Sequence, residues 1–328
     1  MYLKPLFKYK YKYSILLKNK KKSMNDNMKF KLNPYWITGL VDAEGCFYVR
    51  LARSKNHKTG WWIQACFQLG FHVRDKDLLL QVKSFFNEIG SIYTINNKAV
   101  LYQVRNLSVI TNVILPHFEK YPLITQKHSD YLLFKKIVEL MDKGEHLTKD
   151  GLIKIVNLKA SLNKGLSNEL KSYFPEVIKI KRPVVVIPDN IDYNWIAGFF
   201  TGEGCFSVTI YKPTYSKSNS HYTVLLRIII SQHSRDKLLI NSLKETLGCG
   251  VIYEHSKDAV TLTISKFKDI YSKIIPLFNE HSIQGVKALD FQDFCKIAKL
   301  VNEKAHLTLA GSEKVREIKL NMNKGRYI

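Results

Sequence analysis

The sequence contains few cysteines and no long apolar run. Its five cysteines, in a chain of 328 residues, form no C-x-x-C pair, which argues against a disulfide framework or a closed zinc site and favours a reducing compartment. No apolar segment approaches the ~20 residues that span a bilayer. The best candidate, residues 225–230, is interrupted by Arg227. These absences exclude a disulfide-stapled mini-protein and an integral membrane protein.

Acidic residues are scarce relative to basic ones. The chain has 51 Lys and Arg against 28 Asp and Glu, a formal net charge of +23, and 45% of its residues are hydrophobic. This composition supports a sizeable core, and the length favours about two domains. The positive surplus predicts a polyanionic partner, with nucleic acid first, an anionic membrane surface second, and solubility alone as the plain alternative.

The first 32 residues form a basic segment. They carry ten lysines and a single acid, Asp26, and their apolar residues show no sustained helical face. Transit sequences favour arginine, so the all-lysine charge argues against that role and leaves a nucleic-acid-binding arm or an extension without a structural role. We expect residues 1–32 to be poorly ordered and to lie outside the fold.

Two long segments of the chain repeat. WITGLVDAEGCF at 36–47 and WIAGFFTGEGCF at 195–206 share seven residues at an offset of 159. Arg-Asp-Lys at 74–76 and 235–237, His-Leu-Thr at 146–148 and 306–308, and Asn-Lys-Gly at 163–165 and 323–325 recur at offsets of 160 or 161. The chain therefore contains two copies of one unit, at 33–165 and 191–328. Residues 166–190 contain three prolines, which exclude a helix interior or a central strand, and are predicted to be the linker.

The hydrophobic periodicity predicts the same order of elements in each copy. In the first copy Asn33-Pro34 is a typical helix start. Helices are expected at 33–41, 75–89, 108–118, 129–141 and 148–162, and strands at 47–52, 64–69 and, as a pair, within 91–104. We therefore predict an α+β fold of two pseudo-symmetric αββαββαα repeats, each with a four-stranded antiparallel sheet covered by helices on one face.

The opening helices carry small residues and end in an acid. Thr38-Gly39 and Ala197-Gly198 would let the two helices pack side by side at a pseudo-two-fold interface, the alternative being a helix–sheet contact within one domain. Glu44 and Glu203 each precede the glycine that ends the motif, although a helix C-terminus disfavours a carboxylate. A cation between the two acids would relieve the repulsion.

Carboxylates and helix-end carbonyls are hard oxygen ligands, suited to Mg²⁺ rather than Zn²⁺. Divalent metal held by one acid from each half is an arrangement suited to phosphodiester hydrolysis. The plain alternative is that both glutamates are solvent-facing cap residues. The two interpretations differ in whether the acids meet.

WITGLVDAEG and WIAGFFTGEG resemble the paired LAGLIDADG motifs of single-chain homing endonucleases, in the I-OnuI-like branch, and the resemblance covers about residues 33–328. It implies that each sheet forms a DNA-binding saddle, with the motif helices packed at the domain interface. The implied activity is a site-specific double-strand cut at a long pseudo-palindromic DNA target, leaving 3′ overhangs and promoting intron mobility. The resemblance also implies a monomer encoded in an organelle, a mitochondrion or alternatively a chloroplast, with no membrane partner. It implies two or three Mg²⁺ ions, for which Mn²⁺ or Ca²⁺ can substitute.

The resemblance also assigns roles to residues. The metal ligands fall on Glu44 and Glu203, with the carbonyls of Ala43 and Gly202 as further ligands. A polar and basic ring around these acids falls on Gln232 and Arg105. Their counterparts are Phe71 and Ser265, so the ring is uneven.

The second motif departs from the family pattern at one further position. Thr201 stands where the first motif has Asp42. Neither is the metal-binding position, so this departure concerns the packing of the helix ends more than catalysis.

Strand alternation predicts the DNA-contacting residues. Counting by two from Glu44 gives one polar face, and Phe47, Val49 and Leu51 form the opposite, apolar one. Extended ribbons fit a major groove, where Arg reads guanine and Gln reads adenine. The predicted contacts are Tyr48, Arg50, Gln64 and Gln68, with Lys55 and Lys58 near phosphates, and in the second copy Ser207, Thr209, Tyr211, Thr223, Arg227 and Ser231. A solvated face is the alternative for each of them.

Two other functions fit the charge. An RNA maturase that assists splicing of its own intron could use the same fold, and so could a DNA-binding protein that does not cut. The pair of acids discriminates among them, since cleavage requires it and splicing or simple binding does not.

Overall fold

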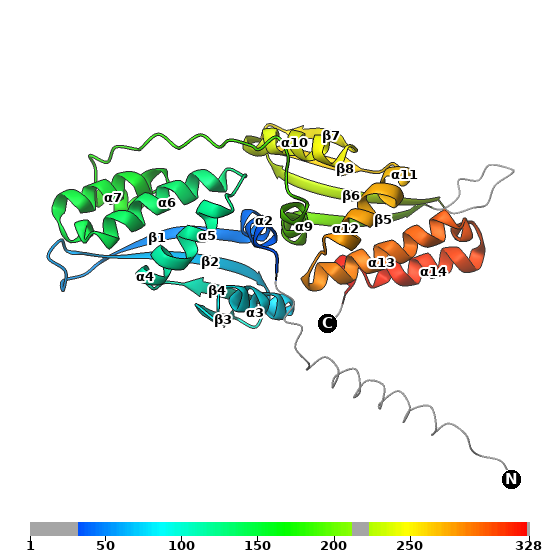
Figure 1. Cartoon of the computed structure of the whole chain (residues 1–328), viewed down its shortest axis with the longest axis horizontal. Coiled ribbons are helices and arrows are strands. Elements are labelled where there is room, and N and C mark those ends of the chain that lie inside the picture. Colours follow the sequence, from blue (N-terminus) through cyan, green and yellow to red (C-terminus); the bar gives the residue numbers. More distant parts are fainter. Residues whose placement is uncertain (1–31, 212–222, 327–328) are drawn as a thin grey trace, which may run out of the picture. The chain divides into compact units, whose positions relative to one another are not determined.

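The computed structural model describes residues 32–211 and 223–326, so all of the predicted N-terminal extension except Leu32 lies outside the described residues. From Asn33 onward the chain forms one unit built of two repeats (Figure 1). The first repeat contains α2 (Pro34–Glu44), β1 (Gly45–Arg53), β2 (Trp61–His72), α3 (Lys76–Phe85), β3 (Ser91–Ile95), β4 (Ala99–Val104), α4 (Leu107–Val109), α5 (Leu115–Lys120), α6 (Lys127–Asp142) and α7 (Lys149–Ser161). The second contains α9 (Tyr193–Glu203), β5 (Gly204–Tyr211), β6 (Thr223–His233), α10 (Lys237–Leu247), β7 (Val251–Ser256), β8 (Ala259–Ile264), α11 (Phe267–Asp269), α12 (Ile275–Glu280), α13 (Gly285–Asn302) and α14 (Leu309–Leu320). The predicted α+β class and the αββαββ order are confirmed in both halves, and four helices, α4 to α7 and α11 to α14, follow the second strand pair where the predicted pattern has two.

Each repeat contains a four-stranded antiparallel sheet, with the orders β1-β2-β4-β3 and β5-β6-β8-β7. The side chains of Phe47 and Val49 are buried, as predicted, and that of Leu51 is half-buried. Phe47 stacks on Phe67 across the strand pair and packs edge-on against Tyr131 of α6. The core of the first half therefore lies between its sheet and α6, and the polar face of the strands is on the other side.

The motif helices begin as the sequence predicts. The Asn33 side chain accepts a hydrogen bond from the Tyr35 amide, with Pro34 at the first helical position, and Asp192 caps α9 in the same way. Their ends differ from an ordinary glycine stop, since Gly45 has φ −78° and continues directly into β1. A Cβ on Gly45 would lie 2.7 Å from the Val41 carbonyl oxygen. The glycine is therefore required by close packing at the helix-to-strand junction.

The helix predicted at 108–118 is interrupted. A π-helical segment at Ile110–Ile114 separates α4 from α5, and the second half has the same break at Ile270–Ile274. Pro116 and Pro276 follow these segments and have no amide to donate to the preceding turn. The repeated proline thus accounts for a break that the periodicity alone did not indicate.

The segment predicted as the linker contains a short helix, α8 (Asn168–Tyr173), that the sequence analysis did not predict. The helix ends before Pro175, so the prolines exclude helix only over the rest of the segment. Tyr173 and Phe174 pack on Trp61 at ring-centroid distances of 5.3 and 5.1 Å. Further along, Arg182 donates to Asp130 at 2.8 Å. The linker is thereby docked on the first half, while the exact domain limits stay a prediction.

None of the helices in the described part of the chain is both long enough and apolar enough to cross a membrane.

Candidate active site

The two motif helices pack against each other through their glycines. A Cβ on Gly39 would lie 2.0 Å from the carbonyl oxygen of Trp195, and one on Gly198 would lie 2.0 Å from that of Trp36. No other residue allows so close an approach of the two backbones. Figure 1 shows α2 and α9 next to each other between the two sheets. The predicted interface between the halves is confirmed, and the alternative of a contact within one domain is excluded.

This packing brings the two helix ends together. A Cβ on Gly202 would lie 3.0 Å from Cγ and 3.4 Å from Oε1 of Glu44, so the first acid lies against the end of the second motif helix. Burial raises the pKa of Glu44, and the Glu203 carboxylate raises it further, while two lysines oppose the rise. Both acids are half-buried. They belong to one electrostatic site and are not independent solvent-facing caps.

Two half-buried lysines, which the sequence analysis missed, complete the site. Lys127 Nζ donates to the carbonyls of Val41 (2.8 Å) and Ala43 (3.1 Å), and Lys287 Nζ donates to that of Gly202. Burial lowers the pKa of both lysines, against the opposing effect of the nearby acids. A sequence signal was present, because each lysine stands three residues before an aspartate and the two recur at an offset of 160.

The donor atoms fit a hard divalent cation. Among the described residues there is no group of three or more His, Cys, Asp and Glu side chains that could hold a metal. The available ligands are the carboxylates of Glu44 and Glu203 and the carbonyls of Ala43 and Gly202. All are oxygens, which suits Mg²⁺ or Ca²⁺ and not Zn²⁺. A carbonyl oxygen has two lone pairs, so donation from a lysine leaves one available.

The departure in the second motif has a packing role. Asp42 is buried and accepts hydrogen bonds from the Ile124 amide (2.9 Å), the Thr125 hydroxyl (2.6 Å) and, across the interface, Trp195 Nε1 (2.8 Å). Burial raises its pKa to about 6. In the second half Thr201 donates to the Ala197 carbonyl at 2.8 Å. The two residues hold helix ends in place by different bonds.

The polar face of the first sheet carries a connected network. The strand register pairs Cys46 with Gln68, Tyr48 with Cys66 and Arg50 with Gln64, which confirms that the predicted Tyr48, Arg50, Gln64 and Gln68 share one face. Gln103 Nε2 donates to Tyr48 Oη (3.2 Å) and Gln68 Oε1 (2.8 Å), and Arg105 donates to Gln103 Oε1. Gln103, on β4, was missed because only the first strand pair was considered. Lys55 and Lys58 lie exposed in the β1–β2 connection.

The polar face of the second sheet has different residues in the same rows. Ser207 pairs with Arg227 and Tyr211 with Thr223, so the predicted residues again share a face. Arg227 Nη2 donates to Thr209 Oγ1 at 3.0 Å, and the hydroxyls of Ser231 and Thr261 lie 2.9 Å apart. The two faces therefore present unequal sets of donors and acceptors.

The two residues assigned to the ring around the acids lie in different settings. Arg105 is exposed on the polar face and lies over the ring of Tyr93 at 5.8 Å. Gln232 is half-buried and pairs with Val260. Strand alternation puts it on the side of Ile228 and Ile230 and not on that of Ser231. Catalytic roles for both stay predictions.

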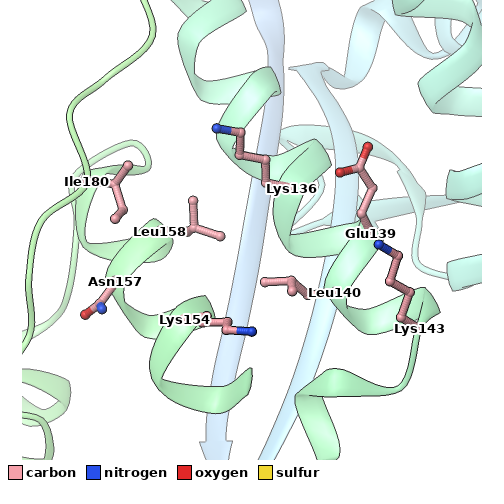
Figure 2. Close-up of a pocket in the computed structure, with 8 residues that line it drawn as sticks. All are labelled: Lys136, Glu139, Leu140, Lys143, Lys154, Asn157, Leu158 and Ile180. Carbon is pink, nitrogen blue, oxygen red and sulfur yellow. The ribbon is translucent and has the colours of Figure 1, made fainter. Parts of the chain in front are cut away.

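A separate groove of about 370 Å³ lies between α6 and α7 (Figure 2). Lys136, Lys143 and Lys154 surround it together with Glu139, and Ile180 of the linker closes one side. The residues that line it include none of the predicted site residues.

The chain is similar in sequence to a known protein family and to curated proteins. A family model described as LAGLIDADG endonuclease matches residues 37–138 and 196–298. "Probable intron-encoded endonuclease 2" of Neurospora crassa is 40% identical over 302 residues, which is 88% of this chain and 64% of that protein. "Probable intron-encoded endonuclease 3" of the same fungus is 40% identical over 296 residues, 89% of this chain and 55% of that protein. The chain thus spans less than two thirds of either relative.

Solved structures agree with the family model. I-SmaMI, a LAGLIDADG homing endonuclease bound to cleaved DNA, is similar with a TM-score of 0.86 and 44% identity, over 90% of this chain and 99% of that one. I-SmaMI has also been solved with an uncleaved DNA target in the presence of calcium ions. Variants of it with alanine in place of one or two lysines have been solved as well.

Proposed function

Because the chain belongs to the LAGLIDADG endonuclease family, we propose that it is a site-specific homing endonuclease that cuts both strands of a long, pseudo-palindromic DNA target. The observation that carries the proposal is the meeting of Glu44 with the end of the second motif helix, where Glu203 lies, between two polar sheet faces. A protein that only bound DNA would have no use for a half-buried acid whose pKa is raised by a second acid beside it.

The reaction is metal-dependent hydrolysis of a phosphodiester bond in each strand, with Mg²⁺ as the metal. Glu44 and Glu203 would hold it with the carbonyls of Ala43 and Gly202, as the donor set allows. A bound divalent cation supplies an activated water and neutralises charge on the scissile phosphate. Lys127 and Lys287 place two further positive charges beside the acids, where the phosphate's negative charge would develop.

The polar faces of the two sheets bind the DNA. Rows such as Arg50–Gln64 in the first half and Thr209–Leu225 in the second present different donors and acceptors. The target is therefore read as two related but unequal half-sites. The net charge of +23 supports binding of the phosphate backbone over both halves.

The relatives named as intron-encoded support a role in intron mobility. The proposed cut is staggered and leaves 3′ overhangs, as the resemblance to the family implies. The chain has 42 lysines against 9 arginines, a usage that suits an A/T-rich mitochondrial genome. The protein acts as a monomer, since one chain supplies both motifs.

The test is cleavage of the intron-lacking allele of the host gene, identified from the DNA that flanks the reading frame. The purified chain with Mg²⁺ should produce a double-strand break. Glu44→Gln and Glu203→Gln should each slow it by at least about 100-fold, since even the partners of metal ligands are worth 10- to 100-fold. The exposed Glu169→Gln in α8 is the matched control and should cut normally. Undiminished cleavage by either motif variant would refute the two-acid mechanism.

The maturase alternative gives a different result in the same variants. A splicing assay of the cognate intron, with and without the protein, measures it directly. If the protein promotes splicing, cuts no DNA and is insensitive to both Glu→Gln changes, the RNA function replaces the proposed one.

A further inference from the structure

The repeated Arg-Asp-Lys motif lies near the site described above, since Asp75 raises the pKa of Glu44 and Lys127 acts to lower that of Asp236. Its aspartates, Asp75 and Asp236, end one-turn 3₁₀-helices that follow β2 and β6. Their side chains are 14% and 5% exposed. In each motif the preceding arginine lies beside Oδ2 of the aspartate, at 4.0 Å in the first copy and 3.7 Å in the second. Oδ1 remains available in both, and it accepts a bond from the opposite half.

Asp75 caps a helix of the second half. Its Oδ1 accepts a hydrogen bond from the amide of Val286, at 2.8 Å, in the first turn of α13. The preceding Gly285 has φ +65°, and a Cβ there would lie 2.6 Å from the same Oδ1. The glycine thus leaves the space that the carboxylate occupies.

Asp236 makes the reciprocal contact. Its Oδ1 accepts a hydrogen bond from the amide of Gln126, at 2.7 Å, at the start of α6 in the first half. A carboxylate at a helix N-terminus is favoured by the helix dipole and by the charge-assisted bond. The two caps therefore cross between the halves in opposite directions.

The capped amides immediately precede the two active-site lysines. Gln126 is followed by Lys127, which donates to the end of α2, and Val286 is followed by Lys287, which donates to the end of α9. We propose that Asp75 and Asp236 are positioning residues: each holds, from the opposite half, the helix start that places one active-site lysine. This inference rests on the proposed nuclease function and assigns the second half's lysine to Asp75 and the first half's to Asp236.

A purely structural role for the two aspartates predicts a different result from a positioning role. If the aspartates only joined the halves, their loss would lower thermal stability, and the rates of cutting both strands would fall together. If they position lysines, the cleavage rate of bound DNA falls while affinity for DNA is kept. Because each cap acts on the lysine at one motif helix, the effect should also be unequal between the two strands and reversed between the two variants.

The experiment uses the full chain and a target labelled separately on each strand, under single-turnover conditions with Mg²⁺. Asp75→Ala and Asp236→Ala should each cut about tenfold more slowly or worse, the usual effect of losing a second-layer partner. Their DNA affinity should stay within about twofold, since neither aspartate lies on a polar sheet face. One strand should be slowed more in the first variant and the other strand in the second.

Three further variants separate positioning from folding. Asp75→Asn should restore most of the rate, because an amide oxygen accepts the same hydrogen bond. Gly285→Ala should reproduce the Asp75→Ala defect while residue 75 stays an aspartate, because the new Cβ would lie 2.6 Å from Asp75 Oδ1 and displace the carboxylate. The exposed Asp77→Ala, two residues along, should cut normally. Thermal unfolding will show whether Asp75→Ala folds. If it does not, the cleavage rates of Asp75→Asn and Gly285→Ala still test the inference.

The outcomes separate the two proposals. If the protein without any substitution cuts no DNA, the nuclease function is refuted, and this inference with it. Two results refute the inference alone, given that the unsubstituted protein cuts DNA. In one, Asp75→Ala and Asp236→Ala cut as fast as the unsubstituted protein, and in the other, each variant reduces the cleavage rates of the two strands equally.

Discussion

His117 and Leu277 hold the same position in the two halves, and only the first can carry a charge. His117 packs edge-on against Phe85 and Phe118, and its Nε2 lies 3.3 Å from the Thr38 hydroxyl on the motif helix. Burial lowers its pKa from the ordinary 6.5 to about 4. The folded state therefore holds this ring neutral at a pH where the unfolded chain would protonate it.

The lowered pKa predicts a pH-dependent stability. Because the unfolded state binds the proton more readily, the stability due to neutral His117 is complete above pH 6.5 and is lost as the pH falls toward 4. Between pH 7 and 5 the loss from this group is about 2 kcal/mol. In His117→Leu, which places the residue of the second half at this position, the difference in free energy of unfolding between pH 7 and pH 5 should be smaller. Denaturant unfolding at the two pH values measures it. An identical pH dependence in the variant would contradict the assignment.

Asp42 predicts a second residue-level effect. Asp42→Ala would leave the Trp195 indole N–H, the Ile124 amide and the Thr125 hydroxyl without their buried acceptor. Each such loss costs about 1–3 kcal/mol, so the free energy of unfolding should fall by about 3 kcal/mol or more. Thr201→Ala, the matched change in the second half, should cost about 1 kcal/mol. Denaturant titration measures the free energy of unfolding of both variants. Equal losses would show that Asp42 and Thr201 contribute equally to stability, contrary to this prediction.

At the scale of elements, the contact between α2 and α9 determines whether there is a site at all. The backbones meet at Gly39 and Gly198, each with a Cβ position only 2.0 Å from a carbonyl oxygen of the other helix. The obstacle is backbone, which cannot rotate away as a side chain can. A small shift here separates the two helix ends that carry Glu44 and Glu203.

Gly39→Ala and Gly198→Ala should therefore lower both stability and cleavage. Overpacking against backbone is expected to cost at least about 2 kcal/mol and to move the acids apart. Gly70→Ala is the control for stability, because its Cβ would meet only the flexible end of Leu101, at 2.9 Å. Thermal unfolding measures stability, and plasmid cleavage is compared with that of the unsubstituted protein. A Gly39→Ala variant as stable as Gly70→Ala and as active as the unsubstituted protein would mean that the helices can pack otherwise.

At the scale of the whole molecule, net charge and the polar sheet faces have different expected roles: the first in affinity for any DNA, the second in the choice of sequence. In the proposed function the surplus of 23 positive charges attracts any DNA, whereas the rows of polar side chains on the two sheets differ from each other. We expect exposed lysines such as Lys58, in the β1–β2 connection, to contact phosphates. Arg50 lies on the sheet face in register with Gln64, where base edges can be read.

Alanine variants at these two positions should separate the effects. Lys58→Ala should weaken binding to all sequences alike and reduce the slope of log affinity against log salt by about 1. Arg50→Ala should cost about 1–3 kcal/mol on the preferred target and relax the preference at one base pair. Binding titrations over a salt series and over single-base target variants measure both. If the two variants lose affinity in the same way, the sheet face does not read bases.

The repeat, the order of elements, the motif glutamates and the shared polar faces of the strands were all predictable from the sequence. These features follow from local patterns, namely alternation in strands, helix starts such as Asn33-Pro34, and a motif that recurs 159 residues later. The short helix α8 and the break at Pro116 were harder, since both depend on where within a segment a proline falls.

The tertiary structure alone decided which residues surround the acids. Lys127 lies 83 positions from Glu44 in the chain and Lys287 lies 84 positions from Glu203, and the caps at Asp75 and Asp236 join residues more than 100 positions apart. No local periodicity specifies such pairs, because each joins segments far apart in the chain, and the two caps also require the halves to meet, as they do at the glycines of α2 and α9. The sequence by itself determined the two halves and their acids, and the packing of one half on the other made them a site.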